Sequence, residues 1–228
     1  GLIGQILIRM LKSTGARPVG VELAEQRCAL ALAGGAELVH NPNQEDVKDF
    51  IERIRALSDG QGCDHIIISA GGTSNAAIEL GPMIGRDRAR VTVIGKTSLS
   101  LSWNAFYEKE MEVIFSRSYG PGRYDAIYEE AGIDYPIGYV RWTERRNLQE
   151  VVRMMASGQL DITSLISSTH DFKDAVDVYE KLNKGELSGI GFLFSYSDVP
   201  TRTRVVQNPI ASPIASRPAA NSVIVTPS

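Results

Sequence analysis

The run Gly1-Leu2-Ile3-Gly4 opens the stretch that decides the fold of this 228-residue chain. The segment that follows, Gln5 to Leu11, is apolar nearly all round, which is typical of a helix buried against a sheet. Gly15-Ala16-Arg17-Pro18 interrupts the helical pattern before the strand-like Val19-Gly20-Val21-Glu22, which ends in an acid. The stretch therefore predicts a glycine turn, a helix and a short strand in succession.

The spacing of Gly1, Gly4 and Glu22 matches the second half of a dinucleotide-binding fingerprint, G-x-G-x-x-G. We expect the first glycine of that motif, and the strand before it, to lie upstream of residue 1. In the motif, glycine lets the backbone approach a pyrophosphate, and an acid about 20 residues further on accepts hydrogen bonds from the adenosine ribose. The alternative interpretation is a helix start with small residues for close packing, with Glu22 as a solvated carboxylate at a strand end.

Composition and charge narrow the class of protein. The net charge of −3 and the pI near 5.7 give no broad basic surface for nucleic acid. No apolar run approaches the length that spans a bilayer, and no segment resembles a secretion signal, so we expect a cytoplasmic protein. Cys28 and Cys63 have neither metal-ligand spacing nor a disulfide pattern, and we expect both to be packing thiols.

Strand and helix patterns alternate as far as residue 118, which predicts a parallel sheet wound with helices. We expect helices at 24–33, 47–57 and 73–84 and strands at 37–40, 64–69, 90–95 and 112–118. The strands at 64–69 and 90–95 end in small residues, Ala70-Gly71-Gly72 and Gly95. Carboxyl ends of strands are where open α/β sheets bind ligands, and a bulky side chain there would block a flat ribose or nicotinamide.

After residue 118 the alternation weakens. We expect an ordered excursion at 124–142, a final strand at 189–196, and a linker or tail from Asp198 because prolines accumulate there. The strand-like residues 222–225 are either an added strand or the start of a following domain. Two amphipathic helices are marked by Leu148, Val151, Val152 and Met155, and by Phe172, Ala175, Val176, Tyr179 and Leu182 after a capping Asp171.

Six stretches of the first 118 residues occur in the order of one known family: G-L-I-G-Q at 1–5, V-G-V-E-L at 19–23, A-L-A-G-G-A at 31–36, G-C-D-H-I-I-I-S-A-G at 62–71, V-T-V-I-G at 91–95 and F-Y-E-K-E-M-E-V at 106–113. They resemble the nucleotide-binding domain of the medium-chain dehydrogenase/reductase family, the zinc alcohol dehydrogenase and sorbitol dehydrogenase group. Residues 161–166 resemble the segment in which that family's chain returns to its catalytic domain. Residues 118–125 and 132–144 resemble bacterial two-part oxidoreductases, in which such a dehydrogenase is joined to a glucose-fructose-oxidoreductase-like domain.

The resemblance implies a Rossmann-like doubly wound parallel sheet that lacks its first strand, with a small C-terminal α+β extension. We expect a nucleotide-binding domain at 1–140, an extension at 141–197, and a linker or tail at 198–228. The family's N-terminal catalytic domain, which supplies its zinc ligands, has no counterpart in these residues. We therefore expect no catalytic or metal-ligating residue here, and an isolated chain that is inactive.

The resemblance also implies residues that bind the cofactor. The N–H groups of Leu2 and Ile3 would bind the pyrophosphate and Glu22 the ribose diol, and because a carboxylate repels a 2′-phosphate, we expect NAD rather than NADP. Arg27 could instead take that phosphate, stack on adenine, or lie solvated on a helix face. Lys96 could touch a ribose or phosphate, or lie in water. The predicted cofactor-binding residues are Gly1, Leu2, Ile3, Gly4, Glu22, Arg27, Ser69, Ala70, Gly71, Ile94, Gly95, Lys96 and Ser118.

Three functions fit these patterns. The first is the NAD-binding portion of an oxidoreductase that transfers a hydride between a nicotinamide cofactor and an alcohol, polyol or sugar-like substrate. The second is a non-catalytic nucleotide-binding or interaction module, and the third a wound sheet that binds S-adenosylmethionine. A homodimer is expected if residues 85–96 lie near an edge of the sheet, since dehydrogenases of this group commonly pair through an edge strand.

Overall fold

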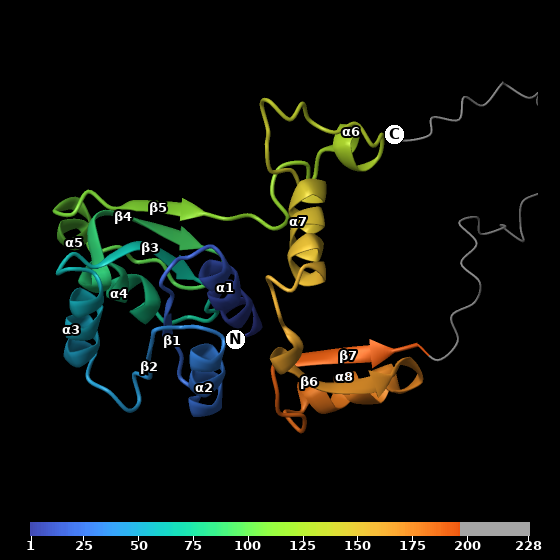
Figure 1. Ribbon diagram of the computed structural model, residues 1–228, viewed down its shortest axis with the longest axis horizontal. Helices are drawn as coiled ribbons and strands as arrows, with labels where there is room; N and C mark the ends of the chain where they lie inside the picture. The colour runs from blue at the N-terminus through green and yellow to red at the C-terminus, as the bar shows by residue number, and fades with distance from the viewer. Residues whose placement is uncertain (197–228) are drawn as a thin grey trace, which may run out of the picture.

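Parallel strands alternate with helices through the first half of the computed structural model, which describes residues 1–196. Every pair of strands in this part runs parallel, which confirms the predicted winding (Figure 1). The elements in order are α1 (Leu2–Ser13), β1 (Val19–Val21), α2 (Glu25–Ala33), β2 (Leu38–His40), α3 (Val47–Leu57), β3 (Cys63–Ile68), α4 (Ala76–Ile84), β4 (Gly85–Val93), α5 (Trp103–Tyr107) and β5 (Glu112–Phe115).

The sheet is built in two parts, a pair β1–β2 and a triplet β3–β4–β5. In the doubly wound order 3-2-1-4-5-6, these five strands take every position except that of the first strand, which belongs between β1 and β3. Among residues 1–196, no strand pairs with the second edge of β1 or with the second edge of β3. The fold is therefore a Rossmann-like sheet without its first strand, as the sequence predicts.

Helix α3 packs against both parts of the sheet. Its Phe50 is 0% exposed and its Ile54 2% exposed, as the predicted apolar face requires. The Phe50 ring stacks on that of His40 from β2, with ring centroids 4.5 Å apart. The same core takes in Val19 of β1 and Ile66 of β3. One helix thus shares a single apolar core with both parts of the sheet.

Strand β4 differs most from its prediction. It begins at Gly85 rather than residue 90, directly after α4, which itself begins at Ala76 rather than residue 73. It pairs with β3 on one side and with β5 on the other. The expectation that residues 85–96 lie near a dimerising edge is therefore wrong, because the later β5 occupies that edge. The ends of other strands differ by one to three residues from their predictions, since β2 begins at Leu38 rather than residue 37, β3 spans Cys63–Ile68 rather than 64–69, and β5 ends at Phe115 rather than residue 118. The final strand, predicted at 189–196, is Gly191–Ser195.

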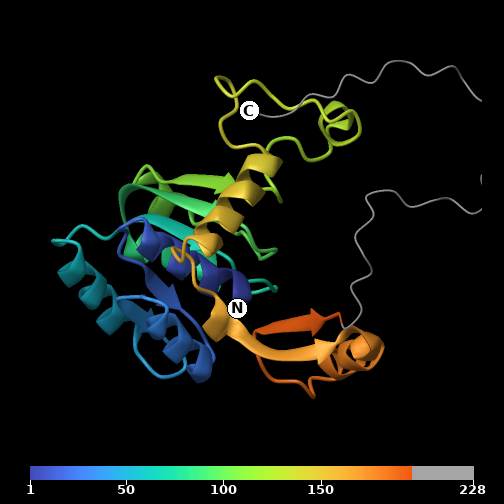
Figure 2. The same cartoon turned by 45° about the vertical axis from the view of Figure 1, so that its right-hand side comes forward.

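The C-terminal part forms a separate unit of helix and strand. Residues 116–142 make an ordered excursion that contains α6 (Ala126–Glu129), and α7 (Glu144–Ala156) leads back from it. The strands β6 (Ile166–Asp171) and β7 (Gly191–Ser195) then pair in parallel, and α8 (Ala175–Asn183) lies between them in the sequence. Figures 1 and 2 both show β6, α8 and β7 standing apart from the β3–β5 triplet. The predicted small α+β extension is thus confirmed, whereas the predictions for 198–228, including the strand-like 222–225, lie outside the described residues.

The apolar faces expected on α7 and α8 are only partly buried. Leu148, Val152 and Val176 are 55%, 64% and 74% exposed, whereas Met154 and Val178 are buried. Helical spacing identifies an apolar stripe, but it does not show which neighbours cover it. Asp171 caps the short 3-10 turn Phe172–Asp174 rather than α8 itself. No helix within residues 1–196 is long and apolar enough to cross a bilayer.

Candidate nucleotide-binding site

The first turn of α1 is open to a ligand. Gly1 is its N-cap residue, with no side chain to cap the helix and no acid in the first turn. Leu2 and Ile3 are 40% and 53% exposed, whereas every residue of the predicted buried stretch, Gln5–Leu11, is buried or half-buried. The N–H groups at the start of a helix have no partner within it, and the helix dipole places partial positive charge there. This turn can therefore hold an anion on its backbone.

Glu22 lies beside this turn. The N–H of Glu22 donates to the His40 carbonyl at 3.0 Å, which extends the β1–β2 pairing by one residue. Its Oε2 accepts a hydrogen bond from the amino group of Gly1 at 3.0 Å. The fold therefore brings together the two parts of the predicted fingerprint, which are separated in sequence by a helix and a strand.

The other carboxylate oxygen of Glu22 is already engaged. Its Oε1 accepts from the backbone N–H groups of Leu23 at 2.9 Å and Ala24 at 3.1 Å. The Nη2 of Arg27 also donates to it at 2.8 Å, while the buried Nε of Arg27 has no partner within the described residues. Oε2 is thus the oxygen of Glu22 that faces the first turn of α1 and that a ribose hydroxyl would share.

These contacts change the acidity of Glu22 and predict a pH dependence. Burial disfavours the carboxylate, but hydrogen bonds from Arg27, the Ala24 N–H and the Gly1 amino group outweigh it and lower its pKa to about 2 from 4.5. A lowered pKa stabilises the fold above pH 4.5, and this contribution is lost as the pH falls toward 2. We expect Glu22→Gln to lower the free energy of unfolding by up to about 3 kcal/mol at pH 6 and about 1 kcal/mol at pH 3.

Urea unfolding of the wild type and Glu22→Gln at both pH values measures this difference. Comparing the two proteins at each pH removes the titration of the other carboxylates that they share. An equal loss at pH 3 and pH 6 would show that the ionised Glu22 adds nothing to stability through these hydrogen bonds.

The turns after β3 and β4 meet next to α1. A Cβ on Gly4 would lie 3.1 Å from the Ser69 Oγ, and a Cβ on Gly95 only 2.0 Å from the Ala70 carbonyl oxygen. Two backbone N–H groups, those of Ile94 and Gly95, donate to the Ile68 carbonyl at 2.9 and 3.0 Å. The predicted residues Ser69, Ala70, Gly71, Ile94, Gly95 and Lys96 therefore lie at adjacent strand ends, with Ser69 facing the start of α1.

Ser118 is placed differently. Strand β5 ends at Phe115, and the Ser116 N–H still donates to the Val93 carbonyl at 2.9 Å. The carbonyl of Ser118 accepts from the N–H of Gly120 at 2.9 Å, so Ser118 belongs to the following turn. It makes no hydrogen bond with the other predicted residues within 1–196 and does not lie on the strand end itself.

Two positioning residues in α1 escaped the sequence prediction. Gln5 and Arg9 are 2% and 8% exposed, and the Nε2 of Gln5 donates to the Arg27 carbonyl at 2.7 Å. The Nη1 of Arg9 donates to the Gln5 carbonyl at 3.1 Å, and its Nη2 donates to the Ser164 Oγ at 2.9 Å. Gln5 holds the backbone of Arg27, the partner of Glu22, and Arg9 in turn holds Gln5. Two polar residues four apart in an otherwise apolar helix were the available indication in the sequence.

The comparison with known proteins agrees with this geometry. The family described as zinc-binding dehydrogenase matches residues 3–131, more than half of the chain. The chain belongs to the zinc-binding dehydrogenase family. The resemblance to the nucleotide-binding domain of medium-chain dehydrogenases is thereby confirmed. Among curated protein sequences, none matches the chain.

Solved structures share the fold of this zinc-binding dehydrogenase domain at low sequence identity. An Escherichia coli oxidoreductase/dehydrogenase of unknown specificity involved in membrane biogenesis superposes with a TM-score of 0.64 at 19% identity, over 87% of this chain and 49% of that one. An E. coli short chain alcohol dehydrogenase complexed with NADH gives 0.58 at 17%, over 80% and 46%. L-idonate 5-dehydrogenase from E. coli gives 0.60 at 16%, over 85% and 48%. The chain thus spans about half the length of these proteins.

The family name implies zinc, but the described side chains do not fit a zinc site. Within residues 1–196 no three His, Cys, Asp or Glu side chains come together in a way that could hold a metal ion. Burial raises the pKa of the thiols of Cys28 and Cys63, both free, and so disfavours the thiolate form that binds metal. No step of the chemistry is assigned to zinc on these residues.

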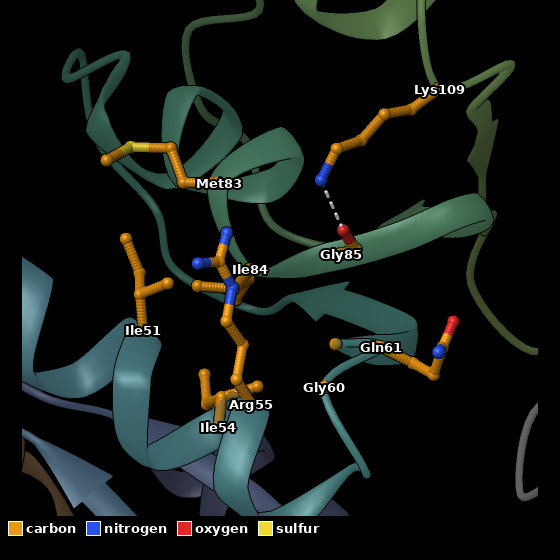
Figure 3. A pocket seen from close by; sticks show the side chains of 10 residues that line it. Ile51, Ile54, Arg55, Gly60, Gln61, Met83, Ile84, Gly85 and Lys109 are labelled. Atoms are coloured by element: carbon orange, nitrogen blue, oxygen red, sulfur yellow. Dashed lines mark hydrogen bonds between the residues drawn. The ribbon is translucent and has the colours of Figure 1, made fainter.

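A small hollow lies at the other end of the sheet and is distinct from the candidate nucleotide site. It has a volume of about 190 Å³ and lies where α3 and α4 end and β4 begins (Figure 3). Across its mouth the Nζ of Lys109 donates to the Gly85 carbonyl at 2.7 Å. Gly85 is the first residue of β4, whereas the candidate nucleotide site lies beyond Val93, the last residue of that strand. The volume of the hollow is below the roughly 300 Å³ of common ligand pockets.

Proposed function

We propose that this chain binds NAD and is the nucleotide-binding portion of an oxidoreductase that transfers a hydride between a nicotinamide cofactor and an alcohol, polyol or sugar-like substrate. The observation that carries the proposal is the contact of Glu22 with Gly1, the N-cap residue of α1, at 3.0 Å. That contact places a carboxylate beside a helix N-terminus, which are the two features that bind the ribose and the pyrophosphate of a dinucleotide.

Each part of the site has a distinct task in this proposal. The N–H groups of Leu2 and Ile3 bind the pyrophosphate, and Gly4 keeps the backbone close to Ser69. The strand-end residues 69–71 and 94–96 leave room for the remainder of the cofactor, because they are small or exposed where it would lie. The nicotinamide supplies the hydride chemistry when bound, and the protein binds and orients it.

The pairing of Arg27 with Glu22 favours NAD over NADP. The Arg27 guanidinium contacts Glu22 at 2.8 Å, and the Glu22 side chain is only 12% exposed. An ionised carboxylate at this depth repels a 2′-phosphate, and the arginine that could attract one is already paired. Two solved structures of the same fold support the substrate class, since one is a short chain alcohol dehydrogenase complexed with NADH and another is L-idonate 5-dehydrogenase.

Titration calorimetry of the full chain with NADH, NADPH and S-adenosylmethionine tests the proposal. We expect NADH to bind, NADPH to bind at least about 10-fold more weakly, a difference of about 1.4 kcal/mol, and S-adenosylmethionine not to bind. Tighter binding of NADPH would overturn the role of Glu22. Binding of S-adenosylmethionine alone would overturn the dehydrogenase assignment.

Replacing Glu22 by glutamine is expected to weaken NADH binding about 10-fold, because an amide oxygen is a weaker acceptor than a carboxylate oxygen. The preference for NADH over NADPH should also become smaller, because the neutral amide does not repel the 2′-phosphate. Glu37→Gln is a matched control, since Glu37 also pairs with an arginine, Arg17 at 2.7 Å, but lies before β2 rather than after β1. Calorimetry should show unchanged NADH binding by Glu37→Gln. Equal losses in the two variants would remove Glu22 from the site.

A further inference from the structure

Residues 117–124 form a fixed turn beyond β5, here called the Tyr-Arg loop. Tyr119 and Tyr124 have φ angles of 68° and 67°, a conformation that is rare for bulky residues. Helix α7 holds the loop, since the Asn147 Nδ2 donates to the Tyr119 carbonyl at 3.0 Å and the N–H of Glu144 donates to the Pro121 carbonyl at 2.8 Å. Strained residues of this kind persist where surrounding contacts impose them, and they often occur at ligand sites.

Two arginines of the loop stack on one tyrosine ring. The Cζ of Arg117 lies 4.1 Å from the centroid of the Tyr124 ring, and that of Arg123 lies 4.8 Å from the same centroid. Arg123 also lies 5.1 Å from the centroid of the Tyr119 ring. A stacked guanidinium uses its flat face for the ring and keeps its N–H donors, which lie in its plane, free to bind.

The charges of the two arginines are balanced unequally. Arg123 forms an ion pair with Glu129. Arg117, by contrast, is exposed and makes neither an ion pair nor a hydrogen bond with any residue of 1–196. Hydrogen bonds from Ser118 and Arg123, with the charges of both arginines, lower the pKa of the Tyr124 phenol. The loop therefore presents one uncompensated positive charge next to a polarised phenol.

The loop begins next to the candidate nucleotide site. The N–H of Ser116 donates to the carbonyl of Val93, the residue that precedes the predicted cofactor-binding residues 94–96. Arg117 is the next residue along the chain, so its backbone starts one Cα step, about 3.8 Å, from a residue bonded to β4. A substrate lying over the strand ends of β3 and β4 would have the Tyr-Arg loop at its side.

We propose that the Tyr-Arg loop binds the anionic group of the substrate, a carboxylate or a phosphate, and that the substrate is an anionic sugar-like alcohol. This inference rests on the proposed function and narrows its substrate class. The guanidinium fork of Arg117 matches the paired oxygens of a carboxylate or phosphate. Tyr119 and Tyr124 are 53% and 59% exposed, so the parts of their rings that the guanidinium groups leave uncovered offer apolar surface to the carbon skeleton beside that group.

The test compares ligands that differ in charge. D-gluconate, D-sorbitol 6-phosphate and neutral D-sorbitol are titrated into the full chain with NADH present, and binding is followed by titration calorimetry. We expect at least one of the two anions to bind 10-fold or more tightly than sorbitol, and the tighter anion tells carboxylate from phosphate. Equal binding of all three ligands, or binding of none, would overturn the inference.

Variants assign the effect to Arg117. Arg117→Gln should remove the preference for the anion over sorbitol, and Arg117→Lys should keep a part of it, because the charge stays but the fork is lost. Arg141→Gln is the matched control, since Arg141 is also exposed and stacks with its Cζ 4.1 Å from the Trp142 ring. Equal effects of Arg117→Gln and Arg141→Gln would overturn the role of the loop.

The same titrations keep the two proposals apart. NADH binding by the wild type without a preference for anions would overturn the role of the loop alone. A preference for anions in a chain that does not bind NADH would overturn the dehydrogenase assignment and leave the anion site standing.

Discussion

Replacing Gly95 by alanine is expected to destabilise the protein by about 2–3 kcal/mol and to lower its melting temperature by about 5–10 °C. A Cβ at this position would lie 2.0 Å from the oxygen and 2.7 Å from the carbon of the Ala70 carbonyl. Both atoms belong to the backbone, so no side-chain rotation relieves the clash. The turns after β3 and β4 must separate, and we expect NADH binding to weaken with them.

Thermal unfolding followed by circular dichroism, together with NADH titration, measures both effects. Gly138→Ala serves as the control, because an added Cβ there meets no atom within 4 Å. We expect that control to melt within a degree or two of the wild type. A Gly95→Ala protein as stable as Gly138→Ala would show that the two turns do not lie in contact.

Truncation of Phe50 to alanine is expected to cost about 3–5 kcal/mol, the largest loss of stability for a single side chain in this domain. Phe50 is 0% exposed and packs between the two parts of the sheet, where its ring stacks on His40. The substitution removes apolar burial and leaves a cavity that α3 cannot close without moving off the strands.

Urea unfolding measures the cost, and Phe115→Ala is its control, since Phe115 is 70% exposed on β5. We expect less than about 1 kcal/mol for that control. Amide hydrogen exchange should also show protection falling in β1 and β2 of Phe50→Ala, because α3 is what ties them to the triplet. A loss confined to α3 would contradict that coupling.

The sequence predicted the order of elements well because their patterns are local. Alternating apolar runs and glycine turns gave every strand from β1 to β5, and the stripe of α3 correctly placed Phe50 and Ile54 in the core. Burial on α7 and α8 was predicted less well, because it depends on which elements cover each face. The start of β4 was missed because α4 runs into it without a turn.

The candidate site was predictable in part. The spacing of Gly1 and Glu22 places them together in any wound sheet, and the structure has them 3.0 Å apart. The pairing of Arg27 with Glu22, by contrast, could not be predicted, because an arginine at this position of a helix can adopt several geometries. Gln5 and Arg9 act through hydrogen bonds to Arg27 and Ser164, which lie 22 and 155 residues away in the sequence. No local sequence pattern predicts contacts at such separations.

The interrupted sheet leaves an open position between β1 and β3. Facing edges of β1 and β3 present backbone N–H and C=O groups that pair with no strand of residues 1–196. Such edges are templates for an extended segment, whatever its side chains, because the bonds are made by the main chain. An extended segment in this position would therefore join the β1–β2 pair and the β3–β5 triplet into one continuous sheet.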